Sequence, residues 1–424
     1  MMIQIGSRTS FGIVTALVLG WAGVSLFGAD AEHGVIWVHP GDSLQGALDQ
    51  AASNTVCKVV RVTPGTYRPG ARGQALIALD HRHDGITLEA AGPVTLTAAN
   101  AAIADPTTPT FPTVVNHVIY LGDGISSNTI IRGFRITGGN RFATDVDPPG
   151  RVIEPHFDDL RRTEGIYGHL FFHTDGAGIK VFGRSYPTLD RLEVVDNEAQ
   201  PCAGGISIEH RGYAQSRVTL RNCVFRGNRA LVTGSAVDLL PGSAATIQNC
   251  LFVGNLSNTG NQYQSLKGNL NWTNIPTLVR SAVGYLPEHG SGAVTVFPGS
   301  MALLLSCTFT ANRNGIDDHG GRSVLRGCIF WKNNAEGGAR SGERYELDVI
   351  RGTRVDNCFI AGGIADLRGV VDPAHNLIGC PDPGFNGRYV PTHPAFAAAG
   401  YRPVDAHAPD PPALPGALGS NIDY

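Results

Sequence analysis

Two segments, Cys223-Val224-Phe225-Arg226-Gly227-Asn228 and Cys250-Leu251-Phe252-Val253-Gly254-Asn255, share one pattern in which Asn follows Cys by five residues. The pattern recurs at Cys307-Thr308-Phe309 with Asn312 and at Cys328-Ile329-Phe330 with Asn333. Weaker copies are Cys358-Phe359-Ile360, Leu192-Glu193-Val194 with Asn197, and Phe134-Arg135-Ile136. Self-similarity of this kind is typical of a solenoid, in which each repeat stacks on its neighbour.

A second apolar segment precedes each copy. Val237-Asp238-Leu239 begins 13 residues before Cys250, and Ile316-Asp317 begins 12 residues before Cys328. Period-two alternation within these segments, with Gly, Asn and Pro between them, predicts strands rather than helices. Each unit is therefore strand, turn, strand, turn. A short unit with two or three strands coils into a parallel β-helix, in which equivalent strands pair about 4.8 Å apart.

Stacking of the coils places equivalent side chains in rows. The Cys and Phe of the repeat are expected to form inward ladders, and the Asn a turn ladder in which each amide bonds the next. The five repeat Cys are then small buried apolar residues rather than disulfide partners, because their Cβ vectors point the same way. The other three cysteines, Cys57, Cys202 and Cys380, lie outside this ladder, and the sequence does not pair them.

Both ends of the chain differ from the repeats. Residues 1–31 resemble a secretory signal, with Arg8, an apolar stretch and the cleavage site Ala29-Asp30-Ala31. An uncleaved anchor is the alternative, but we expect cleavage, no stable membrane insertion afterwards, and a secreted, periplasmic or cell-surface location. The β-helix is expected over 32–390, with loop insertions at 138–175 and 256–290, followed by a Pro- and Ala-rich tail at 391–424. Asp42-Ser43 is expected to begin a helix that caps the N-terminal end with one apolar face, formed by Leu44, Ala47, Leu48 and Ala51.

Composition excludes several classes of protein. Apolar residues make up 42% of the chain and charged residues 16%, which excludes disorder over most of its length. The formal net charge of −3 provides no basic field for nucleic acid. We expect a monomer.

The segment Val38-His39-Pro40-Gly41-Asp42-Ser43-Leu44, followed by Val62-Thr63-Pro64-Gly65-Thr66-Tyr67, resembles the start of pectin-lyase-like right-handed parallel β-helix proteins. The Gly-rich strand followed by Cys-x-Phe-x-x-Asn is similar to their repeat. The resemblance covers about residues 35–390. It implies an all-β, right-handed parallel β-helix with an N-terminal capping helix, and a long polysaccharide as partner. Proteins of this fold include lyases, glycoside hydrolases, epimerases and non-catalytic β-helices, so the resemblance is specific for fold and weak for activity.

Strand alternation predicts which side chains face outward. The residue after each inward Ile, Val or Leu forms an exposed column: Lys180, Ser207, Asp238, Thr295, Asp317 and Asp348. Two positions later a second outward column follows: Phe182, Glu209, Leu240, Phe297, His319 and Ile350. Two positions earlier the residues are nearly all small: Gly178, Gly205, Ala236, Ala293, Gly315 and Glu346. This arrangement predicts a flat floor for an extended sugar chain, walled by the two insertions.

Acid–base chemistry is assigned to Asp317 and Asp238, with His319 or Lys180 assisting. Substrate binding is assigned to Glu209, Phe182, Phe297 and Asp348. If the long gap between Cys250 and Cys307 is one coil with an insertion, Asp238 and Asp317 lie two coils apart, on the order of 10 Å. That separation is near the upper end of the range in inverting glycosidases. Asp318 would then face inward, so either the strand ends at Asp317 or Asp318 caps a turn.

The sequence leaves several alternatives open. The resemblance to polygalacturonases is partial, because an Asp-Asp pair is present but their Gly-His-Gly and Arg-Ile-Lys motifs are absent. A calcium-dependent lyase would use Lys180, Asp238 and Asp317, and calcium is the candidate cofactor, although the sequence identifies no metal site. A non-catalytic carbohydrate-binding or cell-surface β-helix is the alternative to an enzyme. The sequence does not identify the glycan.

Overall fold

The computed structural model describes residues 31–32, 34–144, 175–199, 202–210, 214–231, 233–257, 292–333, 345–362, 367–369 and 371–398. The predicted signal segment, apart from Ala31, lies outside these residues. So do most of the two predicted insertions and the tail beyond residue 398.

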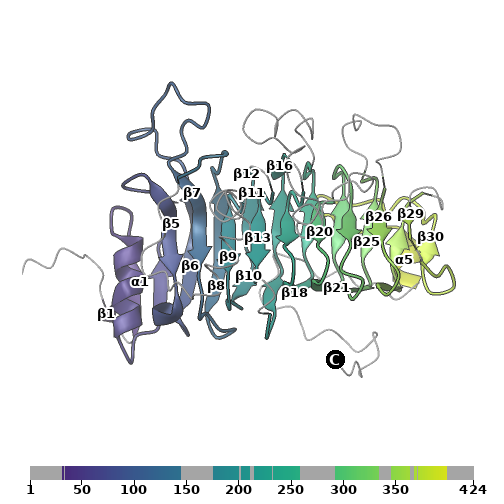
Figure 1. Cartoon of the computed structure of the whole chain (residues 1–424), viewed down its shortest axis with the longest axis horizontal. Coiled ribbons are helices and arrows are strands. Elements are labelled where there is room, and N and C mark those ends of the chain that lie inside the picture. Colours follow the sequence, from purple (N-terminus) through teal and green to yellow (C-terminus); the bar gives the residue numbers. More distant parts are fainter. Residues whose placement is uncertain are drawn as a thin grey trace, which may run out of the picture.

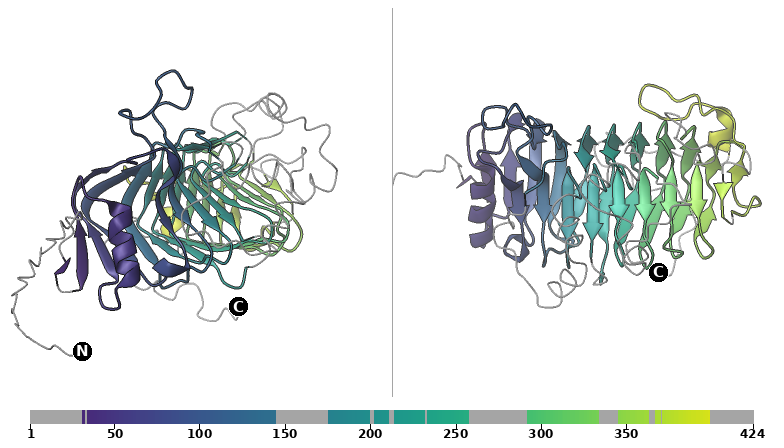
Figure 2. Two further views of the ribbon diagram at one scale, coloured as in Figure 1. Left: turned by 60° about the vertical axis from the view of Figure 1, so that its left-hand side comes forward. Right: turned by 45° about the horizontal axis from the view of Figure 1, so that its top comes forward.

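Parallel strands stack in three rows, which we call the first, second and third sheets, and so form a parallel β-helix (Figures 1 and 2). The first sheet contains β5 (Gly73–Leu79), β7 (Val115–Leu121), β9 (Ile179–Phe182), β13 (Ile206–Glu209), β17 (Val237–Leu239), β20 (Val294–Val296), β23 (Ile316–Asp318), β26 (Leu347–Val349) and β29 (Leu367–Arg368). Each of these strands pairs in parallel with the equivalent strand of the next coil.

The other two sheets share two long strands, β6 (Thr87–Thr97) and β8 (Ile130–Thr137), whose first and second halves pair in different sheets. The second sheet also contains β2 (Val35–Val38), β3 (Val59–Val62), β10 (Thr188–Asp190), β14 (Val218–Arg221), β18 (Ala244–Gln248), β21 (Met301–Leu305), β24 (Val324–Arg326) and β27 (Arg354–Asp356). The third contains β4 (Gly65–Tyr67), β11 (Glu193–Val195), β15 (Val224–Arg226), β19 (Leu251–Val253), β22 (Thr308–Thr310), β25 (Ile329–Trp331), β28 (Phe359–Ile360) and β30 (Leu377–Ile378). Two further pairings are short. β1 (Ala31–Glu32) pairs with β2 in antiparallel orientation, and β12 (Glu198–Ala199) pairs with β16 (Arg229–Ala230) in parallel orientation.

The predicted inward ladders are confirmed. Phe225, Phe252, Phe309 and Phe330 are fully buried and stack face to face, with ring centroids 4.4 to 4.9 Å apart. The five repeat cysteines are buried and free of disulfides, as are Cys57, Cys202 and Cys380. Burial of these rows supplies the continuous apolar core of the solenoid.

The predicted Asn ladder is also confirmed. The Asn255 side-chain amide donates to Asn312 Oδ1 at 2.9 Å and to the Phe225 carbonyl at 2.9 Å. The same pattern links Asn197, Asn228, Asn255, Asn312 and Asn333. At the last step the Asn333 amide donates to Glu346 Oε2 at 2.6 Å, so a carboxylate ends the ladder. The ladder satisfies buried backbone carbonyls at the corner between the third and first sheets.

Each coil has three main strands, so the two-strand unit expected from the sequence is incomplete. The predicted turn before each repeat contains the second-sheet strand, such as β14 before Cys223. Two residues separate it from the third-sheet strand, and the first of them has a positive φ, for example Asn222 at 56° and Ser306 at 52°. One left-handed residue bends the chain sharply enough that no longer turn is needed.

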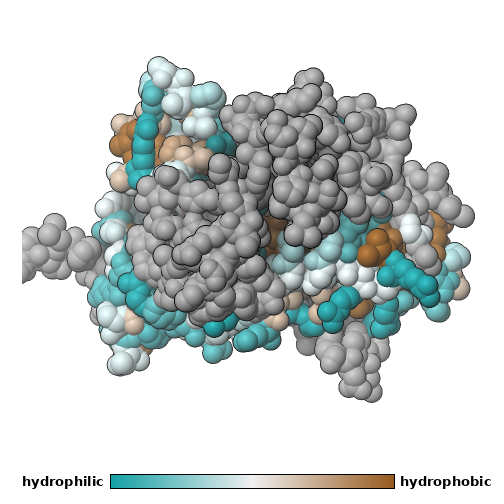
Figure 3. All heavy atoms as spheres, in the orientation of Figure 1, coloured by the Kyte–Doolittle hydropathy of each residue, from teal (hydrophilic) through white to brown (hydrophobic). Residues whose placement is uncertain are grey.

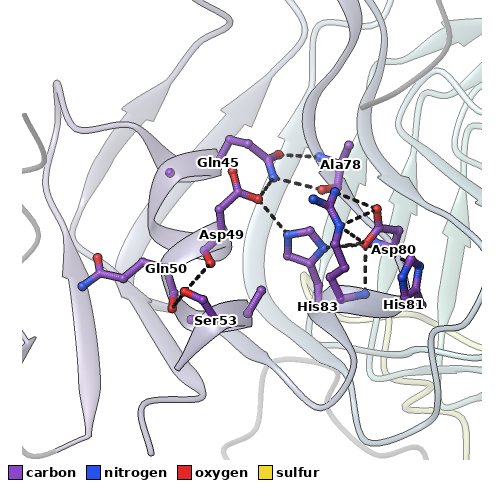
Figure 4. A network of polar contacts seen from close by, with 12 residues as sticks. Gln45, Asp49, Gln50, Ser53, Ala78, Asp80, His81 and His83 are labelled. Atoms are coloured by element: carbon purple, nitrogen blue, oxygen red, sulfur yellow. Dashed lines mark hydrogen bonds and ion pairs between the residues drawn. The ribbon is translucent and has the colours of Figure 1, made fainter. Parts of the chain in front are cut away.

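The N-terminal end is capped as predicted by α1 (Leu44–Ser53), with Ser43 as its N-cap and Leu44, Ala47, Leu48 and Ala51 buried. Gln45 binds both the N–H and the carbonyl of Ala78. Asp49 Oδ1 lies 3.0 Å from His83 Nε2, and Asp80 Oδ1 lies 3.2 Å from His83 Nδ1 in the short helix η1 (His81–His83) (Figure 4). These contacts attach the cap to the first coils.

The C-terminal helix α5 (Pro394–Ala398) packs against the outside of the last coils rather than across their end. Its Phe396 stacks on Phe359 at 4.7 Å and clusters with Ile329 and Cys380.

In the view of Figure 3 the described surface is mostly hydrophilic or neutral, with small hydrophobic areas. Among the described residues, no helix is both long and apolar enough to cross a membrane.

Candidate functional site

The outward column of the first sheet has the predicted register. Lys180 pairs with Ser207, Ser207 with Asp238, Asp238 with Thr295, Thr295 with Asp317, and Asp317 with Asp348. The 57-residue step from Asp238 to its strand partner Thr295 is therefore a single coil with an insertion. Asp238 and Asp317 are two coils apart, as expected, with Thr295 between them.

The column is buried rather than exposed, so this part of the sequence-based prediction is wrong. Asp238 and Lys180 are 0% exposed, and Asp317 and Asp348 are 1% exposed. Their neighbours Ile179, Val181, Val237 and Leu239 belong to the apolar core, so the column does point away from it. The outward side chains instead pair with one another and with residues from the turns that lead into the sheet.

The column of small residues faces inward and is not a floor for a sugar chain. Ala236 and Ala293 belong to the apolar core. A Cβ on Gly178 would lie 2.6 Å from the Gly205 carbonyl and 3.1 Å from a Val194 methyl group. Close approach of the coils at this corner therefore explains the small residues. Glu346, the exception in this column, is the residue that ends the Asn ladder.

Asp238 occupies the centre of the candidate site. The Thr233 hydroxyl donates to its Oδ2 at 2.8 Å, and no described residue hydrogen-bonds its buried Oδ1. Burial raises the pKa of Asp238 to about 7, although the hydrogen bonds from Thr233 and Cys202 oppose this shift. The nearby Asp317 carboxylate acts in the same direction as burial. A carboxyl group of this kind is protonated near neutral pH and can act as a general acid.

Asp317 is held in a different environment. His319 Nε2 lies 2.5 Å from Asp317 Oδ1. Burial lowers the pKa of His319, but its hydrogen bond to Asp317 and the carboxylates of Asp348 and Asp318 outweigh this and raise it. A protonated imidazole beside Asp317 stabilises the ionised carboxylate, which is the form required of a general base.

Asp318 faces inward and belongs to β23, so the strand does not end at Asp317. The alternative expectation, that Asp318 caps a turn, is confirmed. Its Oδ1 accepts from the Gly320 N–H at 2.9 Å and its Oδ2 from the Thr353 hydroxyl at 2.5 Å. Burial raises the pKa of Asp318. These bonds assign it to the turn rather than to the outward site.

Lys180 forms a buried ion pair rather than standing free as a catalytic base. Its Nζ lies 2.5 Å from Glu209 Oε2 and 3.2 Å from Ser207 Oγ. Phe182 and Phe297 are buried on the same outward face, and Phe182 clusters with Tyr120. The register therefore brings all the predicted site residues to one sheet. Phe182, Glu209 and Asp348 lie on coils outside the Asp238–Asp317 pair, and Phe297 follows β20, the strand between them.

A further column lies beside the site, and two of its members, Cys202 and Thr233, were not predicted from the sequence. Asp175, Cys202 and Thr233 each stand four residues before a first-sheet strand, and this equal offset is the signal that the sequence offered. The Cys202 N–H donates to Asp175 Oδ1 at 3.1 Å, and the Thr233 hydroxyl lies 2.9 Å from Cys202 Sγ. Burial raises the pKa of Asp175 well above its usual range. No described residue hydrogen-bonds Asp175 Oδ2.

Gly234 also belongs to the site. Its φ is +57°, and a Cβ there would lie 2.5 Å from the Asp238 carboxyl carbon. Glycine is therefore required for Asp238 to occupy its present position.

Among the described residues, no group of three or more His, Cys, Asp or Glu side chains is arranged to hold a metal ion. The arrangement found is one buried carboxyl group with a raised pKa, Asp238, and one carboxyl group in contact with a histidine, Asp317, two coils apart on one face.

Comparison with known proteins addresses the fold. A family model described as the right-handed β-helix region matches residues 113–270. This segment includes β7 to β19 and therefore the coils that carry Lys180, Glu209 and Asp238. No curated protein matches the chain.

Proposed function

From the right-handed parallel β-helix that this chain forms, we propose that the protein is a glycoside hydrolase acting on an extended polysaccharide. Asp238 is the general acid and Asp317 is the general base. His319 holds Asp317 in position and stabilises its ionised form. The substrate contacts come from five residues around the two carboxyl groups: Lys180, Glu209, Phe182, Phe297 and Asp348. The sequence of residues 1–31 supports export of the enzyme to the cell surface or beyond.

The observation that carries this proposal is the pairing of two unlike carboxyl groups at a fixed spacing. Asp238 lies in a buried environment with one oxygen that no described residue binds, whereas Asp317 lies against His319. Environments that favour opposite protonation states divide acid and base roles between two carboxyl groups. Two coils separate their Cα atoms by about 10 Å, close to the carboxyl separation at which inverting glycosidases place a water molecule and a sugar ring.

The proposed reaction is a single displacement. Asp238 donates its proton to the glycosidic oxygen as the bond to the anomeric carbon breaks. A water molecule attacks that carbon from the opposite face and loses its proton to Asp317. The products are two shorter sugar chains, one of them with a new reducing end, and both carboxyl groups return to their starting states by exchange with solvent.

The test is incubation of the full chain with neutral and acidic polysaccharides, measured by new reducing ends and by ultraviolet absorbance of unsaturated products. We expect new reducing ends without unsaturated products. Asp238→Asn and Asp317→Asn should each lower the rate by at least about a hundredfold, because each removes one acid–base group. Asp196→Asn, at an exposed turn of the same coils, is the matched control and should keep the wild-type rate.

Unsaturated products would instead favour the lyase, and a calcium requirement would favour its metal-dependent form. Full activity of Asp317→Asn would contradict the acid–base assignment.

A non-catalytic carbohydrate-binding or cell-surface β-helix is the second candidate. Burial favours it, because none of the eight proposed residues is more than 8% exposed. Glycan binding without any cleavage, unchanged in Asp238→Asn, is the result expected of that candidate.

A further inference from the structure

We infer that His83 is a pH-dependent clasp on the N-terminal cap, which holds α1 more tightly to the first coils when the imidazole is protonated than when it is neutral. The clasp consists of His83, Asp49 in α1, and Asp80 immediately before η1. It lies in the cap rather than among the residues of the candidate site, so this inference does not depend on the proposed hydrolase.

The imidazole of His83 lies between two carboxyl groups from different elements (Figure 4). Its side chain is only 1% exposed. Nε2 is 3.0 Å from Asp49 Oδ1 in the cap helix, and Nδ1 is 3.2 Å from Asp80 Oδ1 in the first coils. Both nitrogens can donate to these oxygens only when the ring is protonated. One buried positive charge then joins the cap helix to the coils beneath it.

The neutral ring also fits this position, so the loss of a proton changes the charge and not the geometry. The Asp80 backbone N–H lies 3.1 Å from His83 Nδ1 and can donate to it when that nitrogen carries no proton. A neutral ring with its proton on Nε2 still donates to Asp49. Deprotonation therefore removes the electrostatic part of the attachment and keeps its hydrogen bonds.

The two carboxyl groups depend on His83 to different degrees. Asp80 has a second cation, because Arg82 donates to both of its oxygens from Nε at 3.0 and 3.1 Å and from Nη2 at 2.8 Å. Among the described residues, the ion pair of Asp49 is with His83 alone, and the charge of Arg82 reaches it only from farther away. The attraction that deprotonation weakens most is therefore the one between His83 and the cap helix.

The other charged groups around this junction have different contacts. His81 is half exposed, and its Nδ1 lies 4.0 Å from Asp80 Oδ1. Asp84 accepts hydrogen bonds from the turn before β8 rather than from His83. Lys58 donates to the Ala51 carbonyl near the end of α1. None of these groups replaces His83 between the two carboxyl groups.

The direction of the pH dependence follows from the surroundings of His83. Burial lowers its pKa, but the hydrogen bonds to Asp80 and Asp49 and the charges of both outweigh this and raise the pKa above the ordinary 6.5. The docked cap therefore holds the proton more tightly than an undocked one. The resulting stabilisation is complete below about pH 6.5 and is lost as pH rises through the raised pKa. The cap should open more readily in alkaline solution.

Opening of the cap would uncover one edge of the first sheet. β5 ends this sheet and pairs with β7 on one side. On its other side Gln45 of α1 binds both the N–H and the carbonyl of Ala78. A free strand edge is a template for pairing with another chain. The clasp therefore controls how well this edge is protected.

Hydrogen exchange of the full chain between pH 6 and pH 9 tests the inference. Protection factors, corrected for the intrinsic exchange rate at each pH, are compared for peptides covering α1 and, as an internal reference, β18. One unit of pKa difference between the docked and undocked cap is worth about a tenfold change in the docking equilibrium. We expect the ratio of α1 to β18 protection to fall at least about threefold from pH 6 to pH 9.

Three variants identify the group that titrates. Asp49→Asn keeps an acceptor oxygen for His83 and for Gln45 but removes the charge, so most of the fall should disappear. His83→Gln cannot be protonated, and its ratio should be low and constant across this range. His81→Gln removes the neighbouring exposed histidine and should keep the wild-type fall.

Two results would overturn the inference. The first is a wild-type ratio that stays constant from pH 6 to pH 9. The second is a fall of wild-type size in either Asp49→Asn or His83→Gln, because the dependence would then belong to another group.

Discussion

At the scale of single residues, the buried carboxyl group of Asp238 is expected to lower the stability of the fold. Its pKa in the folded chain is about 7 against an ordinary value of 3.8, because burial disfavours the charged form. Between these two values the folded chain keeps a proton that the unfolded chain releases. The free energy of unfolding therefore falls as pH rises from about 4 to about 7, and the loss persists above that range.

Asp238→Asn removes this ionisation, so the variant should be more stable than the wild type at pH 8. We expect an unfolding midpoint a few degrees higher, with the gain disappearing near pH 4. Thermal unfolding across pH measures both. Asp196→Asn, whose side chain is exposed, should show no such trend. A gain that does not grow with pH would show that Asp238 is not a carboxyl group with a raised pKa.

Thr233 provides a second test at this scale. Its hydroxyl donates to Asp238 Oδ2 at 2.8 Å and so stabilises the ionised carboxylate. Thr233→Val should raise the pKa of Asp238, so that activity lost on the alkaline side is lost about one pH unit higher. Thr233→Ser keeps the hydroxyl and serves as the control. The measurement is the pH dependence of kcat/KM, and an alkaline limb that stays in place or moves to lower pH would contradict this assignment.

At the scale of elements, the Asn ladder makes a separate contribution to stability. Asn255 donates to two acceptors and its Oδ1 accepts from Asn228, all in the buried corner of the coil. Asn255→Ala should lower the free energy of unfolding by about 2 kcal/mol or more, because buried polar groups lose their partners. Denaturant unfolding measures this against Asn128→Ala, at an exposed turn. Equal midpoints for the two variants would mean that the ladder does not stabilise the fold.

The ladders were predictable because stacked coils repeat the same side chain at the same place. Cys223, Phe225 and Asn228 show this pattern directly in the sequence. The second-sheet strands were not predictable, because a strand of three residues such as Thr188-Leu189-Asp190 has the composition of a turn. The single left-handed residue that follows it, Arg191, also carries no clear signal.

The candidate site was predictable only in part. Alternation correctly placed Asp238 and Asp317 on one outward column, since side chains on a strand alternate between faces. Their burial was not predictable, because it depends on what packs over the sheet. Thr233 and Gly234 were missed because they act through Asp238 rather than through a motif of their own.

At the scale of the whole molecule, the N-terminal cap protects the open end of the solenoid. Leu48 in α1 is fully buried in the continuous core, and the strands beneath it would otherwise present an exposed apolar end. Leu48→Asp should destabilise the first coils and promote self-association. Size-exclusion chromatography measures this, with Gln50→Asp on the same helix as the control. A monodisperse, equally stable Leu48→Asp variant would contradict the role of the cap.

The geometry of the whole coil also sets the stereochemistry expected of the proposed hydrolysis. Carboxyl groups on adjacent coils would be about 5 Å apart, as in retaining glycosidases, whereas two coils give about 10 Å. The most direct measurement is therefore the anomeric configuration of the first products, followed by NMR during cleavage of a polymer of known linkage. Asp238 and Asp317, separated by Thr295, predict inversion at the anomeric carbon. Retention of configuration, or an unsaturated product, would contradict the account.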